Sequence, residues 1–420
     1  MGIALLTRRN AIRLSAVCSV LGTLVITSAG LAPGAAASDD VQSKQWYLDV
    51  MHADEMWKHS TGKGVKVAVI DTGVNPQTSS LKGQVLVDEV PDAAKYHVTR
   101  DYVGHGTSMA EIIAGTGAGG GIKGLAPGAK IIPIRVGLDA LKDREERAKS
   151  LTSPEAIRAA ADSDAKIINM SFGSEYYEGE EEDAVKYAAS KGKLLFASIG
   201  NGGDKGNKRE YPSSDPYVTG VAAVDKAGTV GNFSTYGNYV DLSAPGLNLP
   251  GWCDTTFTKY CDTQGTSNAS AIASASAALV WSAHPDWTAN QVLRSLIDTA
   301  GRTWPKGKPS KYLGYGLMRP RLVLADKNFD PGPANRDPLA AENGTAPDED
   351  ITATKSPAAS PSAKTPAKDT GSSGGPTSAA AKDADSGSDN TQTWVIIGAV
   401  AAVLVIAGAG FAVKRARRNA

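Results

Sequence analysis

Short and almost uninterrupted apolar runs set the strongest limit on how this chain can fold. They are residues 65–70, 131–136, 167–170, 194–197 and 220–224. Such runs are short for helices, and strands that lack polar alternation are typical of parallel sheets with both faces covered. Helical patterns lie between them, including 183–191, 289–300 and a start at Ser153–Pro154 with serine as the cap. The sequence therefore predicts an α/β domain with a mostly parallel sheet and helices on both faces.

The N-terminal segment has the pattern of an export signal. Residues 1–37 contain an early arginine cluster, a long apolar run and the small residues Ala35, Ala36 and Ala37 before Ser38. These are the three parts of a cleavable secretory signal peptide. An uncleaved N-terminal anchor is the alternative. The pair Arg8–Arg9 leaves the twin-arginine route open beside the general export route, which the following residues favour.

The C-terminal segment has the pattern of a membrane anchor. Residues 394–413 form a charge-free apolar stretch of the length that crosses a bilayer as one helix, with a buried core helix as the alternative. The basic tail, residues 414–420, predicts a cytoplasmic C-terminus and an extracellular chain before the span. Residues 327–393 are poor in large apolar residues and rich in Pro, Ala and Ser, which predicts a disordered linker. We thus expect a single-pass protein of the cell membrane whose extracellular domain, residues 60–326, follows an N-terminal extension, residues 38–59.

Charge and cysteine content exclude some classes of partner and site. Lys and Arg total 44, as do Asp and Glu, so the neutral chain has no general attraction to nucleic acid. With Cys18 inside the signal, only Cys253 and Cys261 remain, which are too few for a structural zinc site. In an exported protein this pair predicts a disulfide that closes a short loop, and two free thiols are the alternative. We identify no metal or cofactor motif.

Three reactive side chains lie beside glycines at the ends of predicted elements. Asp71 follows the first apolar run, His105 lies between Gly104 and Gly106, and Ser267 begins an Ala-rich helical stretch. Each alone has an ordinary explanation as a cap, a structural histidine or a loop serine. In the order Asp, His, Ser within a parallel-sheet domain, they are typical of one convergent catalytic triad.

The motifs Asp71–Thr72–Gly73, His105–Gly106–Thr107 and Gly265–Thr266–Ser267 resemble the signature motifs of the subtilisin family. The resemblance implies that Ser267 attacks the peptide carbonyl, that His105 moves the proton, and that Asp71 holds the imidazole. It also implies that Asn201 stabilises the oxyanion together with the backbone N–H of Ser267. Two further family segments imply substrate contacts from Ser171, Phe172, Gly173, Ala197, Ser198, Ile199 and Gly200. The chain departs from the family at Asn268 and Ala271, where Met and Pro are usual. The difference at Asn268 bears on the shape of the substrate pocket.

A narrower set of features resembles mycosins, the membrane-anchored subtilisins of type VII secretion systems in actinobacteria. These features are residues 45–48 (Gln-Trp-Tyr-Leu), the short extension, the linker, the single span and the basic tail. The resemblance implies a protease that processes proteins or peptides beside membrane components of a secretion system, with disulfides in its loops. A mainly structural role in a secretion complex is the alternative. A hydrolase of esters or lipids is a third possibility, but the Gly-x-Ser-x-Gly elbow is absent.

Overall fold

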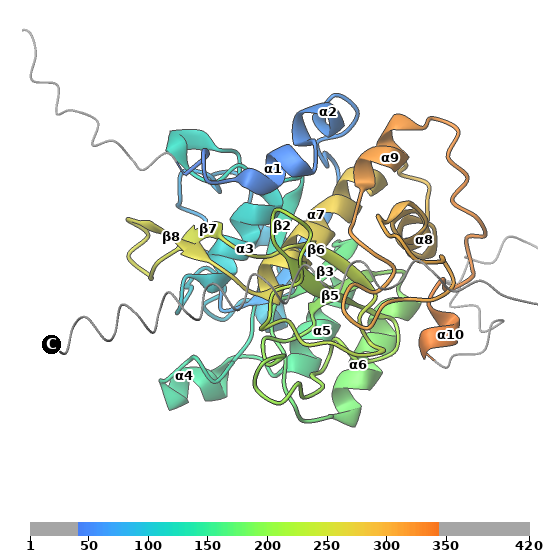
Figure 1. The fold of residues 1–420 in the computed structure, drawn as a ribbon. Coiled ribbons are helices and arrows are strands. Elements are labelled where there is room, and N and C mark those ends of the chain that lie inside the picture. Colours follow the sequence, from blue (N-terminus) through green and yellow to red (C-terminus); the bar gives the residue numbers. More distant parts are fainter. Residues whose placement is uncertain (1–40, 344–420) are drawn as a thin grey trace, which may run out of the picture. The chain divides into compact units, whose positions relative to one another are not determined.

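A six-stranded parallel sheet forms the centre of the computed structural model, which describes residues 41–343 (Figure 1). The strand order is β2-β1-β3-β4-β5-β6. The strands are β1 (Lys66–Asp71), β2 (Lys130–Arg135), β3 (Ile167–Met170), β4 (Leu194–Ser198), β5 (Val218–Val224) and β6 (Leu242–Pro245). The five predicted strands are confirmed with ends shifted by at most two residues, and β6 is an additional strand at the edge.

Successive residues of the strands face two different layers of helices. Val67 and Val69 of β1 belong to the core that includes α3 (His105–Ala114) and α7 (Thr266–Ala283). Ala68 and Ile70 belong to the core of the opposite face, with α5 (Ser153–Asp162) and α6 (Gly179–Ser190). Because both faces are buried, the strands show no polar alternation. The prediction of helices on both faces is confirmed.

Other elements surround these two layers. The remaining helices are α1 (Trp46–Val50), α2 (Ala53–Trp57), α4 (Arg144–Lys149), α8 (Ala289–Thr299), α9 (Pro320–Ala325) and α10 (Ala340–Asn343). Short 3-10 turns are η1 (Val87–Glu89), η2 (Asp92–Ala94) and η3 (Ala118–Gly120), and a separate hairpin consists of β7 (Leu249–Trp252) and β8 (Tyr260–Thr263). The cap of α5 is Thr152 rather than the predicted Ser153, since Glu155 accepts a hydrogen bond from the Thr152 N–H at 2.8 Å.

The N-terminal extension packs on the protein body. Tyr47 is fully buried, and it shares its hydrophobic core with Met56 of α2 and with residues of β1 and α7. The indole N–H of Trp46 donates to the backbone oxygen of Leu247 at 3.1 Å. Gln45 receives a hydrogen bond from the backbone N–H of Lys123 at 2.9 Å. The extension therefore stabilises the domain that follows it.

The packed part of the chain also extends past the predicted start of the linker at residue 327. Leu339 is buried against the main core, and the Thr288 hydroxyl donates to the Ala334 carbonyl at 2.7 Å. The signal, the later linker and the apolar run 394–413 lie outside the described residues. Across residues 41–343, the structure contains no helix with both the length and the apolar character of a membrane span.

Candidate active site

Asp71 and His105 meet at the carboxyl end of the interior strand β1. Nδ1 of His105 lies 2.8 Å from Oδ1 of Asp71 and 3.0 Å from Oδ2. Asp71 is fully buried, whereas 34% of the His105 side chain is exposed. Burial lowers the pKa of His105, but the charge and hydrogen bond of Asp71, with the charge of Asp101, outweigh burial and raise that pKa above its usual value. The buried carboxylate thus orients the imidazole and favours its charged form.

Asp101 organises the turn that presents His105, a role that the sequence did not reveal. Its Oδ1 accepts hydrogen bonds from the Thr72 hydroxyl and the Gly104 N–H, both at 2.7 Å. Its Oδ2 accepts from the N–H and hydroxyl of Thr107, at 2.8 and 2.7 Å. An aspartate shortly before a predicted helix start is a capping signal, and it could have indicated Asp101. Asp101 therefore connects the end of β1 to the first turn of α3.

Ser267 is the second residue of α7, and it contacts the segment that follows β3. Its hydroxyl donates to the backbone oxygen of Ser171 at 3.2 Å, and the Ser171 hydroxyl donates to the backbone oxygen of Ser267 at the same distance. Ser267 is partly exposed. The start of a helix has unpaired N–H groups and a positive dipole end, so developing negative charge beside Ser267 would be stabilised.

Asn201 lies directly beside the start of α7. Its Oδ1 accepts hydrogen bonds from the N–H of Thr266 at 2.9 Å and from the Thr266 hydroxyl at 3.1 Å. Because a backbone N–H can only donate, the contacting atom of Asn201 must be the oxygen. This assignment leaves the Nδ2 group of Asn201 as a donor next to Ser267. The arrangement suits stabilisation of an oxyanion at this position.

Two cavities with shared walls contain most of the predicted site residues. A cavity of about 390 Å³ is lined by Ser267 and Asn201, and one of about 640 Å³ is lined by His105. Both cavities are also lined by Ser171, Phe172 and Gly173. The smaller cavity adds Ser198 and Gly200. Hence His105 and Ser267 border adjoining spaces at one edge of the sheet, where ligands of α/β folds bind, and Asp71 is buried behind His105.

Two of the residues expected to contact substrate have inward side chains. Ala197 and Ile199 are fully buried, and neither lines one of these two cavities. Ala197 belongs to the core beneath α5 and α6, and Ile199 packs with Ala222 and Val240. Alternation along the strand explains this result, since successive side chains of β4 and its extension point to opposite faces. Their side chains therefore position the strand rather than the substrate.

Asn169 on β3 fixes the orientation of α7, a role that was not predicted from the sequence. The side chain is fully buried, and its Oδ1 accepts hydrogen bonds from the hydroxyls of Ser270 at 3.0 Å and Ser274 at 3.1 Å. Its Nδ2 donates to the Ser171 hydroxyl at 2.9 Å. Only the three-dimensional contact reveals this network, because Asn169 and Ser270 lie far apart in sequence. It holds the helix of Ser267 against the sheet.

The two departures from the family pattern lie inside the domain. Asn268 is buried, and its Nδ2 donates to the Thr263 hydroxyl at 3.1 Å. Ala271 is fully buried in the main core. Neither residue lines the two cavities described above. Asn268 therefore connects the start of α7 to β8 and acts on pocket shape only indirectly.

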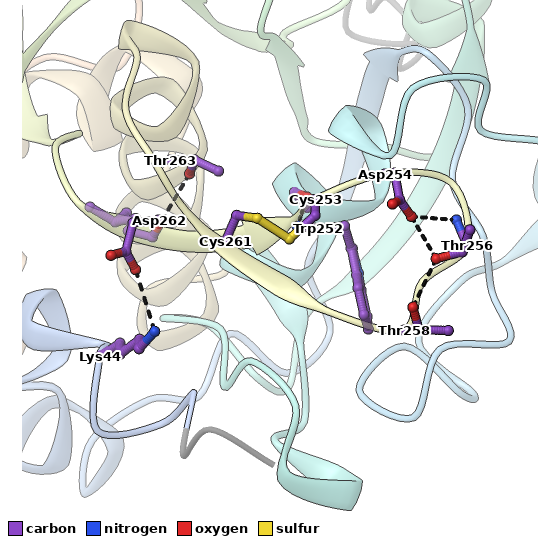
Figure 2. Close-up of a disulfide and its surroundings, with 11 residues drawn as sticks. Lys44, Trp252, Cys253, Asp254, Thr256, Thr258, Cys261, Asp262 and Thr263 are labelled. Atoms are coloured by element: carbon purple, nitrogen blue, oxygen red, sulfur yellow. Dashed lines mark hydrogen bonds and ion pairs between the residues drawn. A yellow bond between two sulfur atoms is a disulfide. The ribbon is translucent and has the colours of Figure 1, made fainter.

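The predicted pairing of Cys253 with Cys261 is confirmed, and the disulfide closes the β7–β8 hairpin (Figure 2). The Trp252 ring stacks on Tyr260 with ring centroids 3.8 Å apart. Figure 2 also shows the ion pair between Lys44 of the extension and Asp262 of the hairpin, at 3.7 Å. The hairpin leads directly into Gly265 and Ser267, so its rigidity bears on the position of the nucleophile candidate.

A buried carboxyl group joins this hairpin to α3. Glu111 is fully buried, and it accepts hydrogen bonds from the hydroxyls of Thr78 at 2.7 Å and Tyr260 at 3.0 Å. Burial raises the pKa of Glu111 to about 7, although these hydrogen bonds oppose the shift. Glu111 thus links the helix of His105 to the disulfide hairpin. Within the described part of the chain, no cluster of three or more His, Cys, Asp or Glu residues could hold a metal ion.

Comparison with known proteins relates this geometry to one family. The model of the subtilase family matches residues 62–316. A thermostable alkaline protease of Halalkalibacterium halodurans is 36% identical over 282 residues, which cover 66% of this chain and 72% of that protein.

Solved structures with the same fold include two proteases of secretion systems. The MycP3 protease from the type VII (ESX-3) secretion system matches with a TM-score of 0.55 and 28% identity, over 69% of this chain and 90% of that one. A serine protease MycP1, described as an essential component of the type VII (ESX-1) secretion system, matches with a TM-score of 0.54 and 29% identity, over 67% and 88%.

Proposed function

The chain belongs to the subtilase family and is a subtilisin-type serine protease, and we propose that it cuts polypeptides outside the cell while anchored in the membrane beside a type VII secretion system. The main support for the proposed peptidase activity is the contact of Asp71 with His105, beside cavities that are also lined by Ser267 and Asn201. Asp71 lies at a strand end, His105 and Ser267 lie at helix starts, and Asn201 lies in the loop after β4, so elements packed on the sheet hold them in place.

The proposed reaction follows from the position of each group. Ser267 attacks the carbonyl carbon of the scissile bond, and His105 accepts the hydroxyl proton. Asp71 holds the imidazole with Nδ1 protonated, so Nε2 is free to act as the base, and it stabilises the imidazolium that forms. Asn201 Nδ2 and the backbone N–H of Ser267 donate to the oxyanion. His105 then gives the proton to the leaving amine, and water hydrolyses the acyl-enzyme.

Sequence patterns support the proposed location. The signal pattern of residues 1–37, the apolar run 394–413 and the basic tail are consistent with export and a single C-terminal anchor. A disulfide between Cys253 and Cys261 suits an oxidising extracellular compartment. The Pro-, Ala- and Ser-rich composition before the apolar run is the kind expected of a tether.

The structural similarity to the MycP proteases supports a role beside a type VII secretion system. The substrates would then be proteins or peptides exported by that system. A second role, as a structural component of the secretion complex, is favoured by the description of MycP1 as an essential component. The two roles differ in whether they need Ser267.

Comparison of secreted proteins separates these roles. The wild type, a Ser267→Ala strain and a deletion strain are analysed by quantitative proteomics of the secreted fraction, with the protein level of the variant checked in membranes. We expect one or more uncut substrates to accumulate in the Ser267→Ala strain, while secretion collapses only in the deletion strain. Identical peptide termini in wild type and Ser267→Ala would contradict the processing role, and normal secretion in the deletion strain would contradict the association with the system.

A further inference from the structure

Glu210 places a carboxylate in the wall of the cavity that contains Ser267. This residue is partly buried and lines the cavity of about 390 Å³ together with Gly173, Gly200 and Asn201. A Cβ atom added to Gly173 would collide with Oε2 of Glu210, and one added to Gly200 would collide with Oε1. The carboxylate therefore lies between the chain segments that follow β3 and β4, and both segments also contact Ser267 or its neighbour through Ser171 and Asn201.

The negative charge of Glu210 has no positive partner within residues 41–343, where no ion pair involves this side chain. Two other charged residues of the cavity, Glu175 and Lys208, form an ion pair with each other at 2.5 Å. The remaining cation, Lys205, is exposed to solvent. Exposed charges are hydrated and screened by salt, whereas a partly buried charge acts more strongly on a ligand.

The environment of Glu210 is one that a bound cation would improve. Burial raises the pKa of Glu210, and the negative charge of Glu175 adds to this effect, while a backbone hydrogen bond from Asn201 opposes it. The hydrogen bond from Asn201 thus replaces only part of the hydration that the carboxylate loses on burial. A cationic side chain that entered the cavity would supply the missing partner through a charge-assisted hydrogen bond.

We propose that Glu210 is a specificity-determining residue that favours substrates with Lys or Arg immediately before the cleaved bond. The inference rests on the proposed attack by Ser267. In the reactive complex, the carbonyl carbon of the cleaved bond lies near Ser267 and its oxygen lies near Asn201. Both residues line this cavity together with Glu210, so the substrate residue that supplies the carbonyl has the shortest path for its side chain into the cavity. The cavity of about 390 Å³ exists with Glu210 in place, so the carboxylate leaves room for a long side chain.

Cleavage-site mapping followed by matched kinetics tests the proposal. The full-length protein, purified in detergent, is incubated with a peptide mixture derived from a whole proteome, and new termini are identified by mass spectrometry. The best-cut peptide is then synthesised with Lys or with Met, an uncharged side chain of similar length, before the cleaved bond. The kcat/KM ratio of the two peptides is measured for wild type, Glu210→Gln and Glu145→Gln, a control that removes an exposed carboxylate on α4.

We expect the Lys peptide to be preferred by at least about tenfold in wild type and in Glu145→Gln, with a ratio near one in Glu210→Gln. The ratio is internal to each variant, so a partial loss of folded protein does not change it. A wild type that cuts peptides without a basic preference, or a Glu210→Gln variant that keeps the preference, overturns the role of Glu210 alone. A wild type that cuts nothing in the mixture contradicts the proposed function as well.

Discussion

Asn201 accepts two hydrogen bonds through Oδ1 from Thr266, the residue that precedes Ser267. Since the oxygen is held by Thr266, the amide Nδ2 group is the donor that remains for an oxyanion. We expect Asn201→Ala to lower kcat by about 10²–10³-fold with little change in KM, because the donor acts mainly in the transition state. Asn201→Asp, which keeps the acceptor but lacks the donor, should lose a similar amount. An Asp variant with wild-type kcat, measured on the same peptide, would contradict the donor role.

Asp71 receives hydrogen bonds from the Thr72 N–H at 2.7 Å and from Nδ1 of His105. An amide at this position would place an N–H group near Nδ1 and favour the tautomer that carries its proton on Nε2. We therefore expect Asp71→Asn to reduce kcat by roughly 10⁴-fold while the fold is retained. Steady-state kinetics and a thermal unfolding curve check both parts. A loss below tenfold in a folded variant would remove Asp71 from the mechanism.

The raised pKa of His105 predicts the acid limb of the activity profile. Only the neutral imidazole accepts the Ser267 proton, so kcat/KM should rise with pH and level off above the pKa of His105. The inflection should lie above the usual histidine value of 6.5, and the residual activity of Asp71→Asn should have its inflection at lower pH. Profiles of both proteins between about pH 5 and pH 9 provide the measurement. An inflection that does not move in the variant would show that Asp71 does not set this pKa.

Because the pKa of Glu111 is raised, we expect this residue to make the stability of the protein, rather than its catalysis, depend on pH. The folded state holds the Glu111 proton up to a pKa of about 7, whereas an unfolded chain releases it near 4.5. Between these values the folded state binds more protons, so this group makes the free energy of unfolding fall as pH rises. Glu111→Gln lacks that effect, and the stability of wild type relative to the variant should decline by up to about 3 kcal/mol between pH 4 and pH 8. Denaturant unfolding across this range measures the difference, and parallel curves would contradict the buried-proton account.

Elements with a strong local pattern were predictable from the sequence. The apolar strands β1 to β5 were found because burial on both faces leaves a continuous run, as at 167–170. By contrast, β6 contains Ser243 and Pro245, and this mixed composition conceals a strand whose burial depends on its neighbours. The burial of Leu339 was not predictable either, because one apolar residue in a Pro- and Ala-rich segment shows no hydrophobic periodicity.

The residues of the candidate site also differ in whether a local sequence pattern indicates them. Asp71, His105 and Ser267 were recognisable because each lies near a glycine at the end of a predicted strand or the start of a predicted helix. This pattern is local in the sequence. Asn169 was missed as a functional support because its hydrogen bonds to α7 join segments that are distant in the chain. Asp101 had a local capping signal before α3, but its contact with Thr72 at the end of β1 could be seen only in the folded structure. Physical chemistry predicts that buried polar groups have partners, but only the folded structure shows which partners they have.

Covalent labelling provides the sharpest test of Ser267 as the nucleophile. The purified protein is treated with a fluorophosphonate, which reacts with activated serine hydroxyls, and the modified residue is located by peptide mass spectrometry. We expect one adduct at Ser267 in parallel with loss of peptidase activity, no adduct in Ser267→Ala, and much slower labelling in His105→Ala. Complete inactivation with the adduct on another serine, or peptidase activity that persists in Ser267→Ala, would contradict the role of Ser267 as the nucleophile.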